Sequence, residues 1–168
     1  EQKYRLKIVI GVNHDNLFTN ENTPWRNWAH FHYLCDSGTE FEGLKIWGSP
    51  WTKTFPGMNP KCKAFTVDTE KELQEKWALI PDDTDILISH CPPLRIRDRT
   101  VDGIDAGSIS LRSKSYNSNI KLHVFSHIHE SYGQVTAYVR TSPKKKIKTC
   151  IYLNCSIMNE RYHPVNAP

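Results

Sequence analysis

The sequence predicts an α/β domain, because short apolar runs typical of buried strands are combined with a clear amphipathic helix. The strand-like runs cover Ile8–Ile10, Ile86–Ile88 and Leu122–Phe125. Each run is continuously apolar, which is the pattern of a strand covered on both faces. At 168 residues the chain is long enough to bury a substantial core. We therefore expect residues 1–168 to form a single domain.

The clearest helix is predicted over Thr69–Ile80. Thr69 can cap its first turn, in which acidic residues complement the positive end of the helix dipole. A second helix is predicted over Ala106–Tyr116, with Ile109 and Leu111 facing inward. Apolar residues of the first helix recur at helical spacing, so we assign them to the core. They are Leu73, Trp77 and Ile80.

Two β-hairpins are predicted from turn residues between strand-like segments. The first has its turn at Asp36–Gly38, which separates Phe31–Cys35 from Glu40–Trp47. The second pairs Gln134–Val139 with Lys148–Asn154, two alternating segments joined by a basic stretch. Together with the buried runs, these segments supply the strands of the predicted α/β domain.

Polar side chains follow the three buried runs at the point where each ends. Asn13 and His14 come after the first, His90 after the second, and His127 and His129 after the third. Because ligands bind outside the carboxyl ends of the strands in an open α/β sheet, we expect these side chains to face one cleft. Imidazole nitrogens and an amide oxygen suit Zn, Mn or Fe. Taken singly each stretch is more typical of ordinary loop residues, but the three together predict a metal site.

The segments NHD, SHCPP and SHIHE, in this order, resemble the last three motifs of the calcineurin-like metallophosphoesterases. Within that superfamily the chain is most similar to the metallophosphoesterase-domain-containing, brain-239-like group. That likeness is carried by LKIWGSPW, by KWALIPDDTDILISHCPP and by the ending LNCSIMNERYHPVN. It runs from about Leu6 to Asn166 and implies the C-terminal part of a four-layer αββα sandwich with two mixed sheets.

The resemblance also implies a role for each polar residue. Asn13, His90 and His127 would ligate one divalent ion and His129 a second, and His14 would be the general acid. The family uses two ions, of Mn, Fe, Zn or Mg, whose bridging hydroxide attacks phosphorus. Further residues are expected to contact the substrate or to orient the groups around it. They are Asp15, Ser126 and Glu130.

Two departures from the family pattern make the domain N-terminally incomplete in our interpretation. The family opens with a D-x-H and then a G-D motif before NHD, and neither is found in this sequence. In addition, Val12 and Ser126 occupy positions where the family usually has glycine. We therefore expect at most one well-supported metal site and no activity from the chain alone. Ser126 would either narrow the pocket or hydrogen-bond phosphate through its hydroxyl and hold the product. A missing N-terminal half or a partner chain would supply the other ligands.

Three functions are compatible with these patterns. The first is a hydrolase, a metal-dependent phosphodiesterase acting on a small phosphoester such as a cyclic nucleotide. The second is a catalytically degenerate nucleotide-binding or structural subunit, which the missing motifs favour. The third, a nucleic-acid-binding module acting through Lys144–Lys148, is the least favoured, since the net charge of +4 is modest.

The cysteine content and the hydropathy of the sequence bear on the cellular compartment of the protein. The five cysteines are odd in number and contain no C-x-x-C pair, so the sequence predicts neither a disulfide framework nor a zinc finger. Reduced thiols fit a cytoplasmic, reducing environment. No apolar run approaches the roughly 20 residues that a membrane span needs, and we expect no membrane association.

Overall fold

The α/β fold class is confirmed by the computed structural model, which describes residues 4–19, 31–139 and 147–167. The strands are β1 (Ile8–Ile10), β2 (His32–Leu34), β3 (Ser37–Phe41), β4 (Leu44–Ser49), β5 (Thr52–Lys53), β6 (Thr66–Val67), β7 (Ile86–Ser89), β8 (Leu122–Phe125), β9 (Gly133–Val139) and β10 (Lys148–Asn154). The helices are α1 (Glu70–Ala78), α2 (Ile109–Asn117) and the short 3-10 helices η1 (Asn16–Thr19) and η3 (His129–Ser131).

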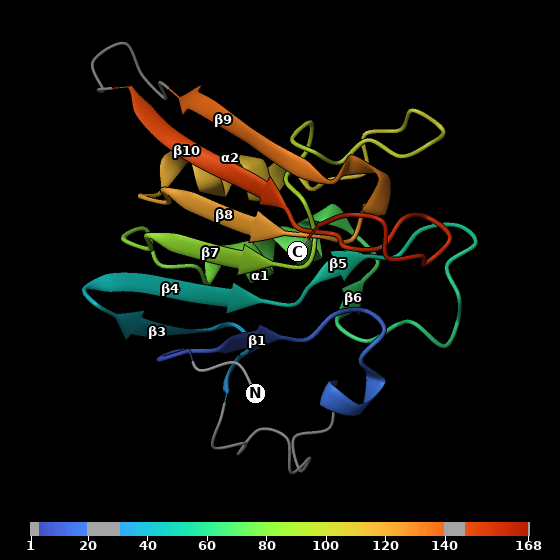
Figure 1. The fold of residues 1–168 in the computed structure, drawn as a ribbon, viewed down its shortest axis with the longest axis horizontal. Coiled ribbons are helices and arrows are strands. Elements are labelled where there is room, and N and C mark those ends of the chain that lie inside the picture. The colour runs from blue at the N-terminus through green and yellow to red at the C-terminus, as the bar shows by residue number, and fades with distance from the viewer. Residues whose placement is uncertain (1–3, 20–30, 140–146, 168) are drawn as a thin grey trace.

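The centre of the fold is a mixed six-stranded sheet with the order β3-β4-β7-β8-β10-β9. Its central strands β4, β7, β8 and β10 run parallel, while β3 and β9 pair antiparallel at the two edges. Helices α1 and α2 lie on one face of this sheet, and β1 lies on the opposite side (Figure 1). Strands β1 and β2 pair with each other in a small parallel sheet. Helices, main sheet and small sheet form three successive layers, in keeping with part of the predicted αββα sandwich.

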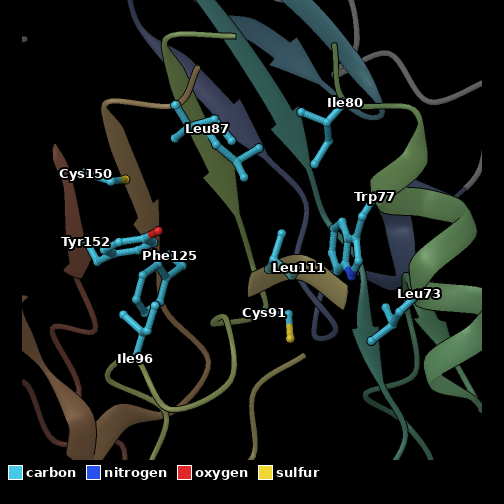
Figure 2. Packing of buried hydrophobic residues seen from close by; sticks show 11 residues of the cluster. Leu73, Trp77, Ile80, Leu87, Cys91, Ile96, Leu111, Phe125, Cys150 and Tyr152 are labelled. Atoms are coloured by element: carbon cyan, nitrogen blue, oxygen red, sulfur yellow. The ribbon is translucent and has the colours of Figure 1, made fainter. Parts of the chain in front are cut away.

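The core lies between the main sheet and the two helices (Figure 2). The cap predicted at Thr69 is present, and it is part of a capping box: the Thr69 side chain accepts from the N–H of Glu72, and the Glu72 side chain accepts from the N–H of Thr69. The three apolar residues of the first predicted helix that were assigned to the core, Leu73, Trp77 and Ile80, are all buried. In α2 the prediction is half right: Leu111 is buried, but Ile109 is exposed. Ile109 is the first residue after the Ser108 cap, and it is 52% exposed.

The first predicted hairpin has its turn in the wrong place. Strand β3 begins within the segment taken as the turn and pairs with β4 through Glu42–Gly43. Both turn residues have positive φ, 51° and 77°, as a type I′ hairpin turn requires. Strand β2 instead runs parallel to β1, with Ile8 opposite His32. Asp36, at φ 45°, redirects the chain between β2 and β3.

The second predicted hairpin is confirmed, with Val139 opposite Lys148 across β9 and β10. Residues 140–146, which include Lys144–Lys146, lie outside the described part of the chain. Lys148 does not face outward as a nucleic-acid contact would. Its ammonium donates to the carbonyls of Ser115 and Ser118, each at 2.6 Å, and so binds the C-terminal end of α2. Neither α1 nor α2 is long and apolar enough to cross a bilayer.

His123 of β8 is a buried polar residue of the core, and its side chain is neutral. Its Nε2 lies 2.8 Å from Ser89 Oγ, whose own proton goes to the Cys91 carbonyl. The imidazole must therefore donate from Nε2, which leaves Nδ1 without a proton. Burial lowers the pKa of His123 to about 3, because the apolar surroundings penalise the charged ring.

This burial predicts an acid-sensitive contribution to stability. An unfolded histidine titrates near pH 6.5, so below that pH the unfolded state binds the proton that folded His123 refuses. We expect stability to fall from about pH 6.5 towards pH 3, by up to about 1.4 kcal/mol per pH unit from this residue. His123→Gln keeps a donor for Ser89 but cannot titrate, and urea unfolding should show a shallower pH dependence in this variant. His32→Gln, which replaces an exposed histidine, is the control and should keep the pH dependence of wild type. An equal pH dependence of the unfolding free energy in His123→Gln and wild type would contradict this contribution of His123.

Candidate functional site

The loops that follow β1, β7 and β8 bring the predicted site residues together at one end of the sheet. β7 ends at Ser89, and His90 is the next residue in the chain. The N–H of Ser126, the first residue after β8, donates to the carbonyl of His90 at 3.3 Å, which ties these two loops side by side. The loop after β1 carries Asn13 to the same place, and Asn13 and His90 are both buried.

Asn13, His90 and His127 form a compact cluster, in which Asn13 and His90 are buried and His127 is half-buried. His90 Nε2 lies 2.7 Å from the side-chain oxygen of Asn13, and this oxygen can only accept, so Nε2 carries the proton. The rings of His90 and His127 meet edge to face with their centroids 4.5 Å apart. His90 Nδ1 is buried and has no hydrogen-bond partner among the described residues. The Asn13 amide nitrogen is occupied in turn, donating to the Cys62 carbonyl at 3.2 Å.

Both histidines of this cluster are neutral near pH 7. Burial lowers the pKa of His90 well below its usual value, and the neighbouring His127 lowers it further. Burial and the nearby His129 and His14 lower the pKa of His127 to about 4. A neutral imidazole keeps an unshared electron pair, so these rings are in the form that binds metal ions.

The cluster fits a metal ion only in part. Its donors are an amide oxygen and imidazole nitrogens, and none is charged. Over residues 4–19, 31–139 and 147–167, no three His, Cys, Asp or Glu side chains are arranged to hold a metal ion. The two carboxylates predicted nearby are engaged elsewhere: Asp15 accepts from the N–H of Val12, and Glu130 from that of Val101. The ligand roles of the clustered residues stay a prediction.

His14 and His129 lie at the more open side of the cluster. His14 Nδ1 is 3.3 Å from the thiol of Cys62. His129 Nδ1 is 2.9 Å from the carbonyl of Asn159, which can only accept, so this nitrogen carries the proton. The free electron pair of His129 is therefore on Nε2. Tyr162 contacts both rings edge to face, with centroid distances of 5.9 Å to His14 and 5.2 Å to His129.

The two positions where the family usually has glycine do not need one in this fold. Neither Val12 nor Ser126 has positive φ; the residue after β8 that does is His127, at φ 72°. The close approach that glycine allows occurs instead at Gly11, where a Cβ would lie 2.4 Å from the Phe65 ring. Positive φ therefore gives no reason for glycine at Val12 or Ser126, and the effect of the Ser126 side chain on the pocket stays a prediction.

Several residues of the site were not predicted from the sequence. Cys62 contacts His14, and the ring of Phe55 meets that of His127 at a centroid distance of 6.4 Å. Both belong to a loop that carries no motif, and the contact of this loop with the histidines depends on the whole fold. Asn159 and Tyr162 lie in the ending NERYHPVN, which carried the family likeness but was assigned no role. That likeness was the available signal for the C-terminal turn. Nothing in the sequence marked Cys62 or Phe55.

Comparison with known proteins gives sequence relatives but no family model that matches. Metallophosphoesterase domain-containing protein 1 of Homo sapiens and that of Mus musculus are each 36% identical to the chain, over 98% of this chain and 54% of the relative. A UPF0046 protein of Caenorhabditis elegans is 34% identical, over 99% of this chain and 46% of the relative. The chain spans about half the length of these curated relatives. The chain is therefore related by sequence to the metallophosphoesterase domain-containing proteins.

Proposed function

We propose that this chain contributes part of a metal-dependent phosphodiesterase site, in which Asn13, His90 and His127 hold one divalent ion and His129 contributes to a second. The observation that carries the proposal is the buried 2.7 Å contact between the Asn13 side-chain oxygen and His90 Nε2. It places the Asn13 amide and the His90 ring, whose Nδ1 has no hydrogen-bond partner among the described residues, beside His127, where three strand-end loops meet. Bound divalent ions supply charge stabilisation for a transferring phosphoryl group and activate water.

The residues around this cluster have defined parts in the proposal. His14 is exposed, and its Nδ1 contacts Cys62, so Nε2 remains to give a proton to the leaving oxygen. The Asn159 carbonyl keeps the proton of His129 on Nδ1, which leaves Nε2 as the ligand atom. The substrate class is a small phosphodiester such as a cyclic nucleotide. Cys62, Cys91, Cys150 and Cys155 form no disulfide, which supports a reducing, cytoplasmic environment.

The alternative function is a nucleotide-binding or structural subunit without catalysis. It is favoured by the lack of a carboxylate ligand in the described part of the chain, since two divalent ions held by neutral groups alone are poorly compensated. Under the main proposal, the carboxylates come from residues outside the described segments or from a partner chain.

The two functions are separated by a hydrolysis assay. We expect the 168-residue chain, with Mn²⁺ added, to show no turnover of bis-p-nitrophenyl phosphate or of a cyclic nucleotide, because the charged ligands of the second ion are missing. Mn²⁺-dependent turnover that disappears in His14→Ala and persists in His32→Ala would contradict this expectation. Turnover gained on adding the uncovered half of a longer relative would support the phosphodiesterase, and continued inactivity would support the non-catalytic subunit.

A further inference from the structure

Two exposed aromatic side chains lie against the histidine cluster from separate loops. The Phe55 ring is 50% exposed and meets the ring of His127 at a centroid distance of 6.4 Å. Tyr162 is 60% exposed and contacts both His14 and His129. Each ring therefore has one edge on the cluster and a large remaining surface in solvent. Exposure of this much aromatic surface beside polar, convergent groups is a feature of ligand sites.

The position of Tyr162 is held by a tight turn rather than by burial. Its φ of 61° lies in the left-handed region, which a bulky residue rarely adopts. The turn is fixed by Asn159, whose side-chain oxygen accepts from the N–H groups of Arg161 and His163 at 2.9 and 3.0 Å. The N–H of Tyr162 donates to the Asn159 carbonyl, the same oxygen that binds His129. Backbone strain of this kind is concentrated at functional sites, and here it holds an exposed ring on two histidines.

We propose that Phe55 and Tyr162 form an aromatic subsite that binds the planar group of an aryl or nucleobase phosphoester while its phosphate lies at the histidine cluster. Aromatic rings offer flat, weakly hydrated faces on which a base or aryl ring stacks. Such stacking does not depend on specific hydrogen bonds. The proposal rests on the proposed function for the location of the phosphate. It adds the two residues that select for the planar group, because an alkyl phosphoester would leave both rings without a partner.

The test compares phenyl phosphate with methyl phosphate, which carry the same phosphate group and differ in the ring. Calorimetric titration of the 168-residue chain in Mn²⁺ should give about tenfold tighter binding of phenyl phosphate, the order that one aromatic stacking contact supplies. Tyr162→Ala and Phe55→Ala should each lower this preference, the ratio of the two affinities, several-fold. Tyr162→Phe should retain it. Tyr138→Ala is the matched control, since Tyr138 is 75% exposed on the edge strand β9.

Failure of the subsite and failure of the proposed function give different results. If methyl phosphate binds but the preference for phenyl phosphate is absent, or survives both alanine substitutions, the subsite is wrong and the phosphate site stands. If neither phosphate binds, the proposed function fails. The subsite is then judged with adenosine, which carries no phosphate: the ring resonances of Phe55 and Tyr162 should shift during its titration in NMR spectra. Unshifted rings overturn the subsite in that case as well.

Discussion

Trp77→Ala is expected to lower the free energy of unfolding by about 3–5 kcal/mol, the range found for truncating a large buried aromatic residue. Trp77 is 1% exposed and packs between α1, α2 and the main sheet. Its indole N–H donates to Ser108 Oγ at 3.0 Å, and the Ser108 hydroxyl donates to Glu70. The substitution therefore removes apolar contacts and also a hydrogen bond that links the N-terminal cap of α2 to α1. Urea denaturation followed by circular dichroism measures the loss.

The matched control for this variant is Leu79→Ala, at the C-terminal cap of α1, where the side chain is exposed. Truncation there leaves no cavity, so we expect a change within about 0.5 kcal/mol. A loss of similar size in both variants would show that stability depends on helix propensity rather than on packing between α1, α2 and the sheet.

His90→Ala is expected to weaken Zn²⁺ binding on the order of 100-fold or more. Loss of a residue that only supports a metal ligand costs about 10- to 100-fold in affinity, and His90 is proposed as a direct ligand. Asn13→Ala should act in the same direction, because its side-chain oxygen lies 2.7 Å from His90 Nε2. Titration with Zn²⁺ against a competing chelator measures these affinities.

Cavity formation at a buried position could lower Zn²⁺ affinity indirectly, so the unfolding of each variant is measured alongside. Asn13→Asp serves as a second variant, since it keeps the size of the side chain and adds the negative charge that the cluster lacks. It should bind Zn²⁺ more tightly than wild type. Equal affinity in wild type, His90→Ala and Asn13→Asp would place the ion elsewhere, whatever the stability of the variants.

The parts of the fold that the sequence predicted well are those determined locally. Helix α1 carries its own cap at Thr69 and a regular apolar spacing, so no distant contact was needed to find it. The first hairpin was missed because Ser37–Gly38 was weighted above Glu42–Gly43, whose positive φ values make the actual turn. The parallel pairing of β2 with β1 joins residues more than twenty positions apart, and local patterns do not record it.

In the candidate site, too, features determined locally were predicted and features that depend on long-range packing were not. Its histidines were found because each directly follows a buried strand, and parallel strands carry such residues to one edge of a sheet. Asp15 and Glu130 were expected near the site because they are next to its histidines in the chain, but backbone N–H groups engage their carboxylates. The contact of Tyr162 with His129 depends on how the C-terminal turn packs, which spacing along the chain does not determine.

Paramagnetic broadening by Mn²⁺ tests most directly whether the Asn13–His90–His127 cluster binds a metal ion. NMR spectra of the 168-residue chain would be recorded as Mn²⁺ is added in substoichiometric steps, with Ca²⁺ as a diamagnetic control. The proposed site predicts that the resonances of Asn13, His90 and His127 broaden first and together, followed by His129, and that His90→Ala removes the effect. Broadening that begins at exposed carboxylates such as Asp82 and Asp83, with the three clustered residues unaffected, would contradict a metal site at this end of the sheet.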